Sequence, residues 1–257
     1  MTPQVSIIMP FWNAEPYLGE AIQSVQAQTG VAWELWLVND ASDDSSRDLA
    51  VAFAESDSRI RLLEDPHGRR LGASAARNFA LDRAASPLVA LLDADDVWLP
   101  GALRQQVEIL ELHPEVAMAY ANAERWLDFQ IPYDGEAGSK GHNYLPPLLP
   151  AGVAPGLVTP PSLLDWFLSD ESLTPCTCTV LVRTEAARRV GGFENEFEGV
   201  YDDQVFYAKV ALHYNIWANP VCLARYRKHS TSLCATSSEP GRAAFLSWLD
   251  SYRKAHP

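Results

Sequence analysis

The chain has 257 residues, 47% of them hydrophobic and 21% charged, and 20 Lys and Arg against 33 Asp and Glu give a formal net charge of −13. This length suffices for one large domain with a substantial core, and the acidic balance argues against a nucleic-acid binder because no basic stripe is present to neutralise phosphates. No apolar run approaches the roughly 20 residues of a membrane helix and no secretory signal is visible at the N-terminus, so we expect a cytoplasmic protein.

The first half of the chain alternates apolar strands with amphipathic helices. The expected elements are, in chain order, a strand at 5–10, a helix at 15–28, a strand at 33–40, a helix containing 47–56, a strand at 59–65, a helix at 73–85 and a strand at 88–92. This rhythm predicts an α/β fold with a mainly parallel, Rossmann-type central sheet and helices on both faces. In such sheets ligands bind beyond the carboxyl ends of the strands.

The second half begins with a helix at about 99–112 and a strand at 116–122, and then the rhythm breaks. The stretch 128–161 is rich in Pro and Gly and is too long for an ordinary connection, which indicates a flexible loop. Regular structure returns at 162–168, with an apolar stretch at 176–182 and a helix near 184–190.

A C-terminal amphipathic helix is expected at 241–256. It places Phe245, Trp248, Leu249 and Tyr252 on one face. Core packing or a partner interface explains this face, and peripheral contact with the inner face of a membrane stays open as an alternative.

The four cysteines give no recognisable metal pattern. Cys176 and Cys178 lie close together, while Cys222 and Cys234 come later. A zinc site that also uses His229 matches no standard spacing, so we expect reduced, mostly buried thiols.

Three carboxylates stand directly behind the strand expected at 88–92. Asp93, Asp95 and Asp96 repel one another, and a fold retains such a group when something offsets its charge. Oxygen-only clusters suit Mg²⁺ or Mn²⁺ better than zinc. The alternative is a solvated turn whose acidic residues cap the helix that begins near Leu99.

Six segments, taken in order, resemble family-2 glycosyltransferases, which have the GT-A fold. They are "VSIIMPFWNAEPYLGEAIQSVQAQT", "ELWLVNDASDDSS", "LGASAARNFALDRA", "LLDADD", "VGGFENEFEGVYDDQVFYAKVALH" and "YRKHSTSL". The resemblance implies one domain over 1–257. Residues 1–122 would bind a nucleotide-sugar, and residues 123–257, with the flexible loop at about 128–161, would bind the acceptor and supply the catalytic base.

The resemblance also implies roles for single residues. The donor-binding set is Pro10, Phe11, Trp12 and Asn13 beside the nucleotide base, Asp40 accepting hydrogen bonds from that base, Gly72 where the backbone approaches the ligand, Arg77 facing the acidic site or the phosphates, and Asp93 and Asp95 on the ribose and the metal. The metal ligands implied are Asp95, Asp96 and His229, holding Mn²⁺ or Mg²⁺.

Asp203 takes the place of the family's catalytic base, after Asp202 where the family usually has Glu. Structural alternatives exist for several of these residues. Asp40 could cap a turn, Arg77 could form an exposed helix salt bridge, and Asp202 and Asp203 could be ordinary first-turn helix residues.

The function implied is metal-dependent, inverting transfer of a sugar from a UDP-, GDP- or dTDP-linked donor to a hydroxyl of a glycan or lipid-linked glycan, in polysaccharide or glycoconjugate biosynthesis. The acceptor site should involve 128–172, where Trp166 and Phe167 either stack on sugars or pack in the core. One alternative is a haloacid-dehalogenase-like phosphatase that uses Asp93 as nucleophile, although three strands precede the motif here. Another is a non-catalytic module that binds a nucleotide-sugar or glycan.

Overall fold

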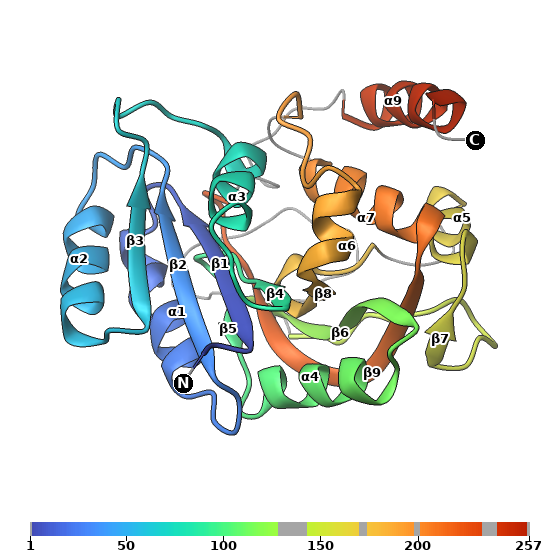
Figure 1. Ribbon diagram of the computed structural model, residues 1–257, viewed down its shortest axis with the longest axis horizontal. Helices are drawn as coiled ribbons and strands as arrows, with labels where there is room; N and C mark the ends of the chain where they lie inside the picture. Colours follow the sequence, from blue (N-terminus) through green and yellow to red (C-terminus); the bar gives the residue numbers. More distant parts are fainter. Residues whose placement is uncertain (1, 128–142, 170–173, 198–200, 233–240, 256–257) are drawn as a thin grey trace.

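A nine-stranded sheet runs through the described part of the chain, which comprises residues 2–127, 143–169, 174–197, 201–232 and 241–255 of a computed structural model (Figure 1). The strand order is β3-β2-β1-β4-β8-β6-β9-β5, and β7 pairs with β9. The strands are β1 (Val5–Phe11), β2 (Trp33–Asn39), β3 (Ile60–Glu64), β4 (Leu88–Leu91), β5 (Val97–Trp98), β6 (Val116–Leu127), β7 (Gly156–Val158), β8 (Leu181–Arg183) and β9 (Asn215–Lys228).

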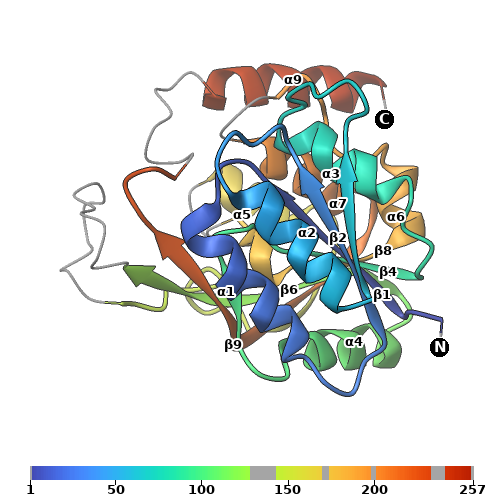
Figure 2. The ribbon, with the colours of Figure 1, turned by 90° about the vertical axis from the view of Figure 1, so that its left-hand side faces the viewer.

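Helices cover both faces of this sheet (Figures 1 and 2). They are α1 (Glu15–Gln26), α2 (Ser46–Ser56), α3 (Ala73–Leu81), α4 (Ala102–Leu112), α5 (Ser162–Leu168), α6 (Thr184–Arg189), α7 (Asp202–His213) and α9 (Gly241–Ala255), with a short 3₁₀ helix, η1 (Thr177–Thr179). The predicted α/β fold with helices on both faces is confirmed.

The four strands β3, β2, β1 and β4 are parallel. The chain moves outward from β1 to β2 and β3, and then returns to place β4 on the other side of β1. The carboxyl ends of β1 and β4 therefore meet where the strand order reverses, which is where doubly wound sheets bind their ligands. The loops after these two strands carry Trp12 and the acidic residues Asp93, Asp95 and Asp96.

The rest of the sheet is mixed. β8 pairs antiparallel with both β4 and β6, whereas β6 and β9 run parallel along almost their whole lengths. β5 and β7 add to β9 in the antiparallel sense. This second half carries α7 and the carboxyl end of β9 to the same region as the acidic loop.

Alternating side chains of β1 divide the core between the two faces. Val5, Ile7 and Met9 pack in a core built with residues of α1 and α4, whereas Ile8 packs with residues of α3, α5 and α7. Phe245 of α9 is only 2% exposed and belongs to the second core. The apolar face of the C-terminal helix is therefore used in core packing.

Some boundaries differ from the expected ones. The helix expected at 73–85 ends at Leu81, and the strand expected at 116–122 extends to Leu127 because its partner β9 pairs with it that far. The stretch 128–161 lies partly outside the described residues. Its described part, from residue 143, contains β7, which is paired with β9 rather than forming an open loop.

Candidate active site

The acidic loop after β4 points its three carboxylates at three different partners. The loop is a turn in which the Asp96 backbone N–H donates to the Asp93 carbonyl at 3.1 Å. Asp93 accepts from the Arg77 guanidinium, Asp95 lies 3.0 Å from His229 Nε2, and Asp96 Oδ1 accepts from the Arg227 backbone N–H at 2.9 Å. Separate partners relieve the mutual repulsion of the three charges.

Arg77 bridges the acidic loop and the start of α7. Its Nη1 donates to Asp202 Oδ2 and its Nη2 to Asp93 Oδ1, each at 2.7 Å. Arg77 is only 5% exposed, so the alternative of an exposed helix salt bridge is wrong. Burial raises the pKa of Asp93, and the Arg77 guanidinium opposes that rise. The buried Arg77 thus ties α3 and the acidic loop to a carboxylate that follows Arg77 by 125 positions in the sequence.

Asp203 lies beside this bridge, in the first turn of α7. Its Oδ2 accepts a hydrogen bond from Thr177 Oγ1 at 3.1 Å, and the Tyr207 hydroxyl donates to the same Thr177 oxygen at 3.1 Å. Burial, with the charge of Asp202 next to it, raises the pKa of Asp203 to about 7. A carboxylate of this pKa is suited to take a proton at neutral pH.

The end of β9 forms another wall of the site. The His229 ring lies 4.4 Å from the Tyr17 ring, centroid to centroid, and its Nδ1 is 2.9 Å from Thr231 Oγ1. Arg227 donates to the Asp95 carbonyl at 2.9 Å and also pairs with Glu20 of α1. These contacts fix the end of β9 against the acidic loop.

The residues expected to bind the donor lie in the loops after β1 and β2 and before α3. The Asp40 carboxylate accepts from the backbone N–H groups of Leu71 and Gly72, so it holds the loop before α3. Gly72 has a φ of 83°, which favours glycine. Trp12 is 46% exposed, and the Arg70 guanidinium lies 3.5 Å from its ring centroid.

A pocket opens beside Asp40. Its lining residues are Asn39, Ala41, Glu64, Asp65, Gly68 and Arg69. The pocket adjoins the carboxyl ends of β2 and β3, which places it at the same edge of the sheet as the acidic loop.

The remaining residues expected near the donor do not all face outward. Phe11 is 3% exposed and belongs to the core. Pro10 lies within β1, opposite Val38 of β2. Asn13 has its side chain hydrogen-bonded to Asp43, which ties the loop after β1 to the turn after β2. Of the expected base-bordering set, Trp12 presents the largest exposed ring.

The structure does not bring all three expected metal ligands together. Asp95 and His229 place an oxygen and a nitrogen 3.0 Å apart, and the Asp95 side chain is 30% exposed. Asp96 is fully buried. Within the described residues, the one group of at least three such side chains whose ligand atoms lie within 4.8 Å of one another is Asp96, Cys176 and Cys178.

Two positioning residues were missed in the sequence, namely Thr177 and Tyr207, which hold Asp203. They come 26 residues before and four residues after that carboxylate, and no local motif marks them. In the segment expected to bind the acceptor, Phe167 is buried and Trp166 packs against the same core, in agreement with core packing rather than sugar stacking. A separate pocket is lined in part by Asn122, Arg125 and Cys176, in the second half of the chain.

Comparison with known proteins identifies the family. The family model described as "Glycosyl transferase family 2" matches residues 6–136. The chain is 41% identical over 120 residues to the UDP-Glc:alpha-D-GlcNAc-diphosphoundecaprenol beta-1,3-glucosyltransferase WfgD of Escherichia coli, which covers 47% of this chain and 46% of that protein. It is 31% identical over 195 residues to the putative glycosyltransferase EpsE of Bacillus subtilis, covering 75% of this chain and 61% of that one. The chain thus spans about half the length of the curated relatives it matches.

Solved structures share the fold. TarS of S. aureus in complex with UDP-GlcNAc superimposes with a TM-score of 0.68 at 18% identity, over 96% of this chain and 65% of that one. The mannosyltransferase PcManGT from Pyrobaculum calidifontis, in complex with GDP-Man and Mn²⁺, gives a TM-score of 0.61 at 20% identity, over 88% and 57%. None of the described helices is both long and apolar enough to cross a membrane. Both the family match and the GT-A-type sheet agree with the resemblance seen in the sequence, and the chain belongs to family 2 of the glycosyltransferases.

Proposed function

We propose that this protein transfers a sugar from a nucleoside-diphosphate donor to an acceptor hydroxyl, with inversion at the anomeric carbon. The observation that carries the proposal is the continuous arrangement Asp203–Asp202–Arg77–Asp93. It places a carboxylate with a pKa of about 7 next to the buried arginine that holds the acidic loop. A base and a charged donor site in one cluster are what direct displacement by a hydroxyl requires.

The donor site is assigned to residues 1–122. Trp12 offers an exposed ring on which a nucleotide base can stack, and the pocket beside Asp40 lies at the same sheet edge. The neighbours named above were solved with UDP-GlcNAc and with GDP-Man, which supports a UDP- or GDP-linked donor; a dTDP-linked donor is the third candidate that the resemblance implies.

The residues present fit a divalent cation at Asp95 and His229. They offer one carboxylate and one imidazole at a partly exposed position, and Mg²⁺ or Mn²⁺ ordinarily takes few protein ligands and completes its shell with water and phosphate oxygens. When bound, such an ion would neutralise the charge that develops on the departing nucleoside diphosphate.

On the acceptor side, Asp203 takes the proton from the attacking hydroxyl. Thr177 donates to Asp203 Oδ2 and so orients the carboxylate, while Tyr207 orients Thr177. A single base with direct displacement needs no covalent sugar–enzyme intermediate, which is the basis for proposing inversion. The acceptor is assigned to residues 123–257 and is a glycan or lipid-linked glycan, in keeping with the undecaprenol-linked acceptor in the name of the E. coli relative.

Thermal stabilisation by nucleotides tests the donor half of this proposal. We expect one of UDP, GDP and dTDP to raise the melting temperature in a Mn²⁺-dependent manner, since a ligand at a hundred times its Kd contributes about 2.7 kcal/mol. Asp95→Ala should remove the metal-dependent part of the shift, and Trp12→Ala should weaken binding of the nucleotide with or without metal. Asp165→Asn, at an exposed position of α5, is the control. No shift with any nucleotide would contradict the donor assignment.

Transfer itself is tested with Asp203→Asn. This variant should bind the nucleotide as the unchanged protein does and lose sugar transfer, because the amide cannot accept the proton. Full transfer activity in this variant would show that a residue other than Asp203 is the base. Nucleotide binding without transfer or donor hydrolysis by the unchanged protein would favour a non-catalytic binding module. The phosphatase alternative loses its basis, because the family match covers the acidic motif that suggested it.

A further inference from the structure

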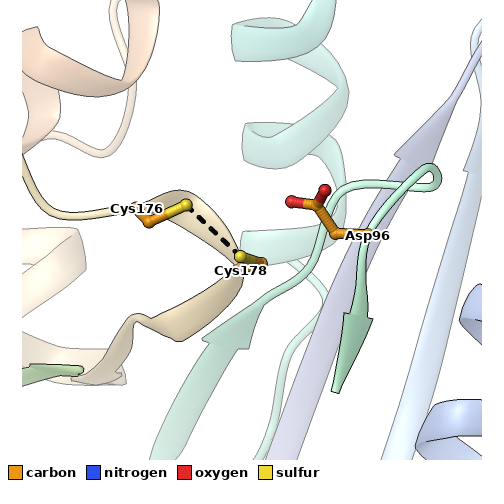
Figure 3. A group of neighbouring side chains, drawn as sticks. All are labelled: Asp96, Cys176 and Cys178. Carbon is orange, nitrogen blue, oxygen red and sulfur yellow. Dashed lines mark hydrogen bonds between the residues drawn. The ribbon is translucent and has the colours of Figure 1, made fainter. Parts of the chain in front are cut away.

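Two thiols and a carboxylate meet beneath the acidic loop. Cys176 and Cys178 flank Thr177, and their sulfur atoms lie 3.3 Å apart. An oxygen of Asp96 lies within 4.8 Å of both sulfur atoms. Figure 3 shows the Asp96 carboxylate, on the loop after β4, pointing toward the two sulfurs from the opposite side.

One oxygen of the Asp96 carboxylate is a buried hydrogen-bond acceptor that accepts no hydrogen bond from the described residues. It is fully buried, and while Oδ1 accepts from the Arg227 backbone N–H, Oδ2 has no hydrogen-bond partner of good geometry among the described residues. A buried carboxylate oxygen without a partner is costly, because it has lost its hydration without a replacement. The weak donors that face it are thiols, so a bound cation is the partner that the three side chains together would satisfy best.

We propose that Cys176, Cys178 and Asp96 bind one thiophilic divalent cation of the Zn²⁺ class. In tetrahedral coordination with metal–sulfur bonds of about 2.3 Å, two sulfur ligands lie roughly 3.8 Å apart. The observed 3.3 Å therefore requires the two thiols to separate by only about half an ångström on binding. The site goes beyond the proposed glycosyl transfer and uses residues distinct from Asp95 and His229.

Charge and access agree with this assignment. Two thiolates and one carboxylate carry three negative charges, which a divalent cation and the Arg125 guanidinium balance; Arg125 Nη1 lies 3.4 Å from Cys176 Sγ. Both thiol protons leave to solvent when the cation binds. Cys176, which is only partly buried, and Arg125 also line a pocket, which gives a cation an approach from the Cys176 side.

The cation would join segments that are distant in the sequence. It would tie the loop after β4 to the segment around η1, and the residue between the two cysteines, Thr177, is the one that donates to Asp203. Sulfur ligands disfavour Mg²⁺ and Mn²⁺, so this cation and the one proposed for the donor are separable by metal type. Its role would be to hold Thr177 at a fixed distance from the acidic loop.

Cobalt is a suitable probe because thiolate-to-cobalt charge transfer gives a strong near-ultraviolet band. We would treat the full chain with a chelator under reducing conditions, add Co²⁺ and then Zn²⁺, and measure absorbance, bound metal per chain and melting temperature. The expected result is one Co²⁺ per chain, a thiolate band that Zn²⁺ removes by competition, and a higher melting temperature with either ion.

Matched variants give the assignment its specificity. Cys176→Ser and Cys178→Ser should each weaken binding at least about a hundredfold, beyond the 10–100-fold typical of changes around a metal site. Cys222→Ser, which alters a thiol whose hydrogen bond goes to the Ala224 carbonyl, should leave binding unchanged. Asp95→Ala should also leave it unchanged while abolishing the Mn²⁺-dependent nucleotide shift, so this proposal and the proposed function can fail separately.

Three results would overturn the site. The first is the absence of a thiolate band in the unchanged protein, and the second is a band that survives in both cysteine variants. The third is a mass two hydrogens lower under non-reducing conditions together with no metal uptake after reduction, which would identify a disulfide-forming pair instead. If Cys178→Ser does not fold, Cys176→Ser still tests the site, because the Cys176 side chain borders the pocket and is only partly buried, so its replacement disturbs the core less.

Discussion

Replacing Arg77 by Met should destabilise the fold strongly. Methionine keeps much of the apolar stem of the side chain but removes the charge that faces Asp93 and Asp202. The Arg77 and Asp202 side chains are only 6% and 9% exposed, so Asp202 is left as a buried carboxylate without its cation. Breaking a buried pair in this way costs about 3–5 kcal/mol. Asp93, at 27% exposed, regains some hydration, which favours the lower part of that range.

Urea denaturation at several pH values measures this cost. Arg104→Ala is the control, since Arg104 and Glu108 are 64% and 49% exposed and such a pair contributes about 0–1 kcal/mol. Arg77 opposes the rise that burial causes in the pKa of Asp93, so its removal raises that pKa further and the folded variant binds protons more readily than the unfolded one. The difference in free energy of unfolding between the unchanged chain and the variant should therefore shrink as the pH falls from 8 to 5.

A free energy of unfolding of the Arg77→Met protein that lies within about 1 kcal/mol of that of the unchanged chain would refute the reasoning. A loss of that free energy no larger than the loss caused by Arg104→Ala would refute it too. A deficit that is the same at pH 5 and pH 8 would also contradict it, because the loss would then come from packing rather than from charge.

Two further predictions concern the same region. The rate of transfer should rise as the pH passes about 7, because Asp203 must lose its proton to act as a base. Thr177→Val should shift this rise in the pH–rate profile to higher pH, because it removes a hydrogen-bond donor to the carboxylate. An unshifted profile would contradict the role assigned to Thr177. Gly192→Ala should be more destabilising in urea than Gly191→Ala. Both glycines have a positive φ, but a Cβ at position 192 would also clash with Asn78 Oδ1, whereas a Cβ at position 191 meets only the end of the Lys209 side chain. Equal losses in the free energy of unfolding would contradict this prediction.

The sequence alone predicts the N-terminal half of the fold well. Between residues 5 and 112 each helix and each strand except β5 lies within a few residues of its expected place, because it is long enough to show its own periodicity. β5 has only two residues and is not among the expected elements. The acidic loop and Trp12 follow strand ends, so the rule that ligands bind beyond the carboxyl ends of parallel strands finds them without a structure.

The second half is less predictable because its pairings are not local. β7 and β8 have three residues each, too few to show a period, and their places in the sheet depend on β9 and on β4 and β6. The contact between Thr177 and Asp203 and the meeting of Asp96 with two cysteines are of the same kind. Such contacts depend on how distant segments pack, and no spacing within either segment encodes them.

The arrangement of the acidic loop explains how an already acidic chain keeps three carboxylates within four residues. Asp93 faces a guanidinium, Asp95 an imidazole and Asp96 a backbone N–H group, so groups of the protein itself hold the three side chains apart. A loop fixed in this way does not have to be ordered by its ligands, and a preformed site binds with less entropic cost than one that must first be assembled. Because Arg77 and Arg227 hold this loop from α3 and β9, their removal should weaken nucleotide binding even though the Asp95 carboxylate remains.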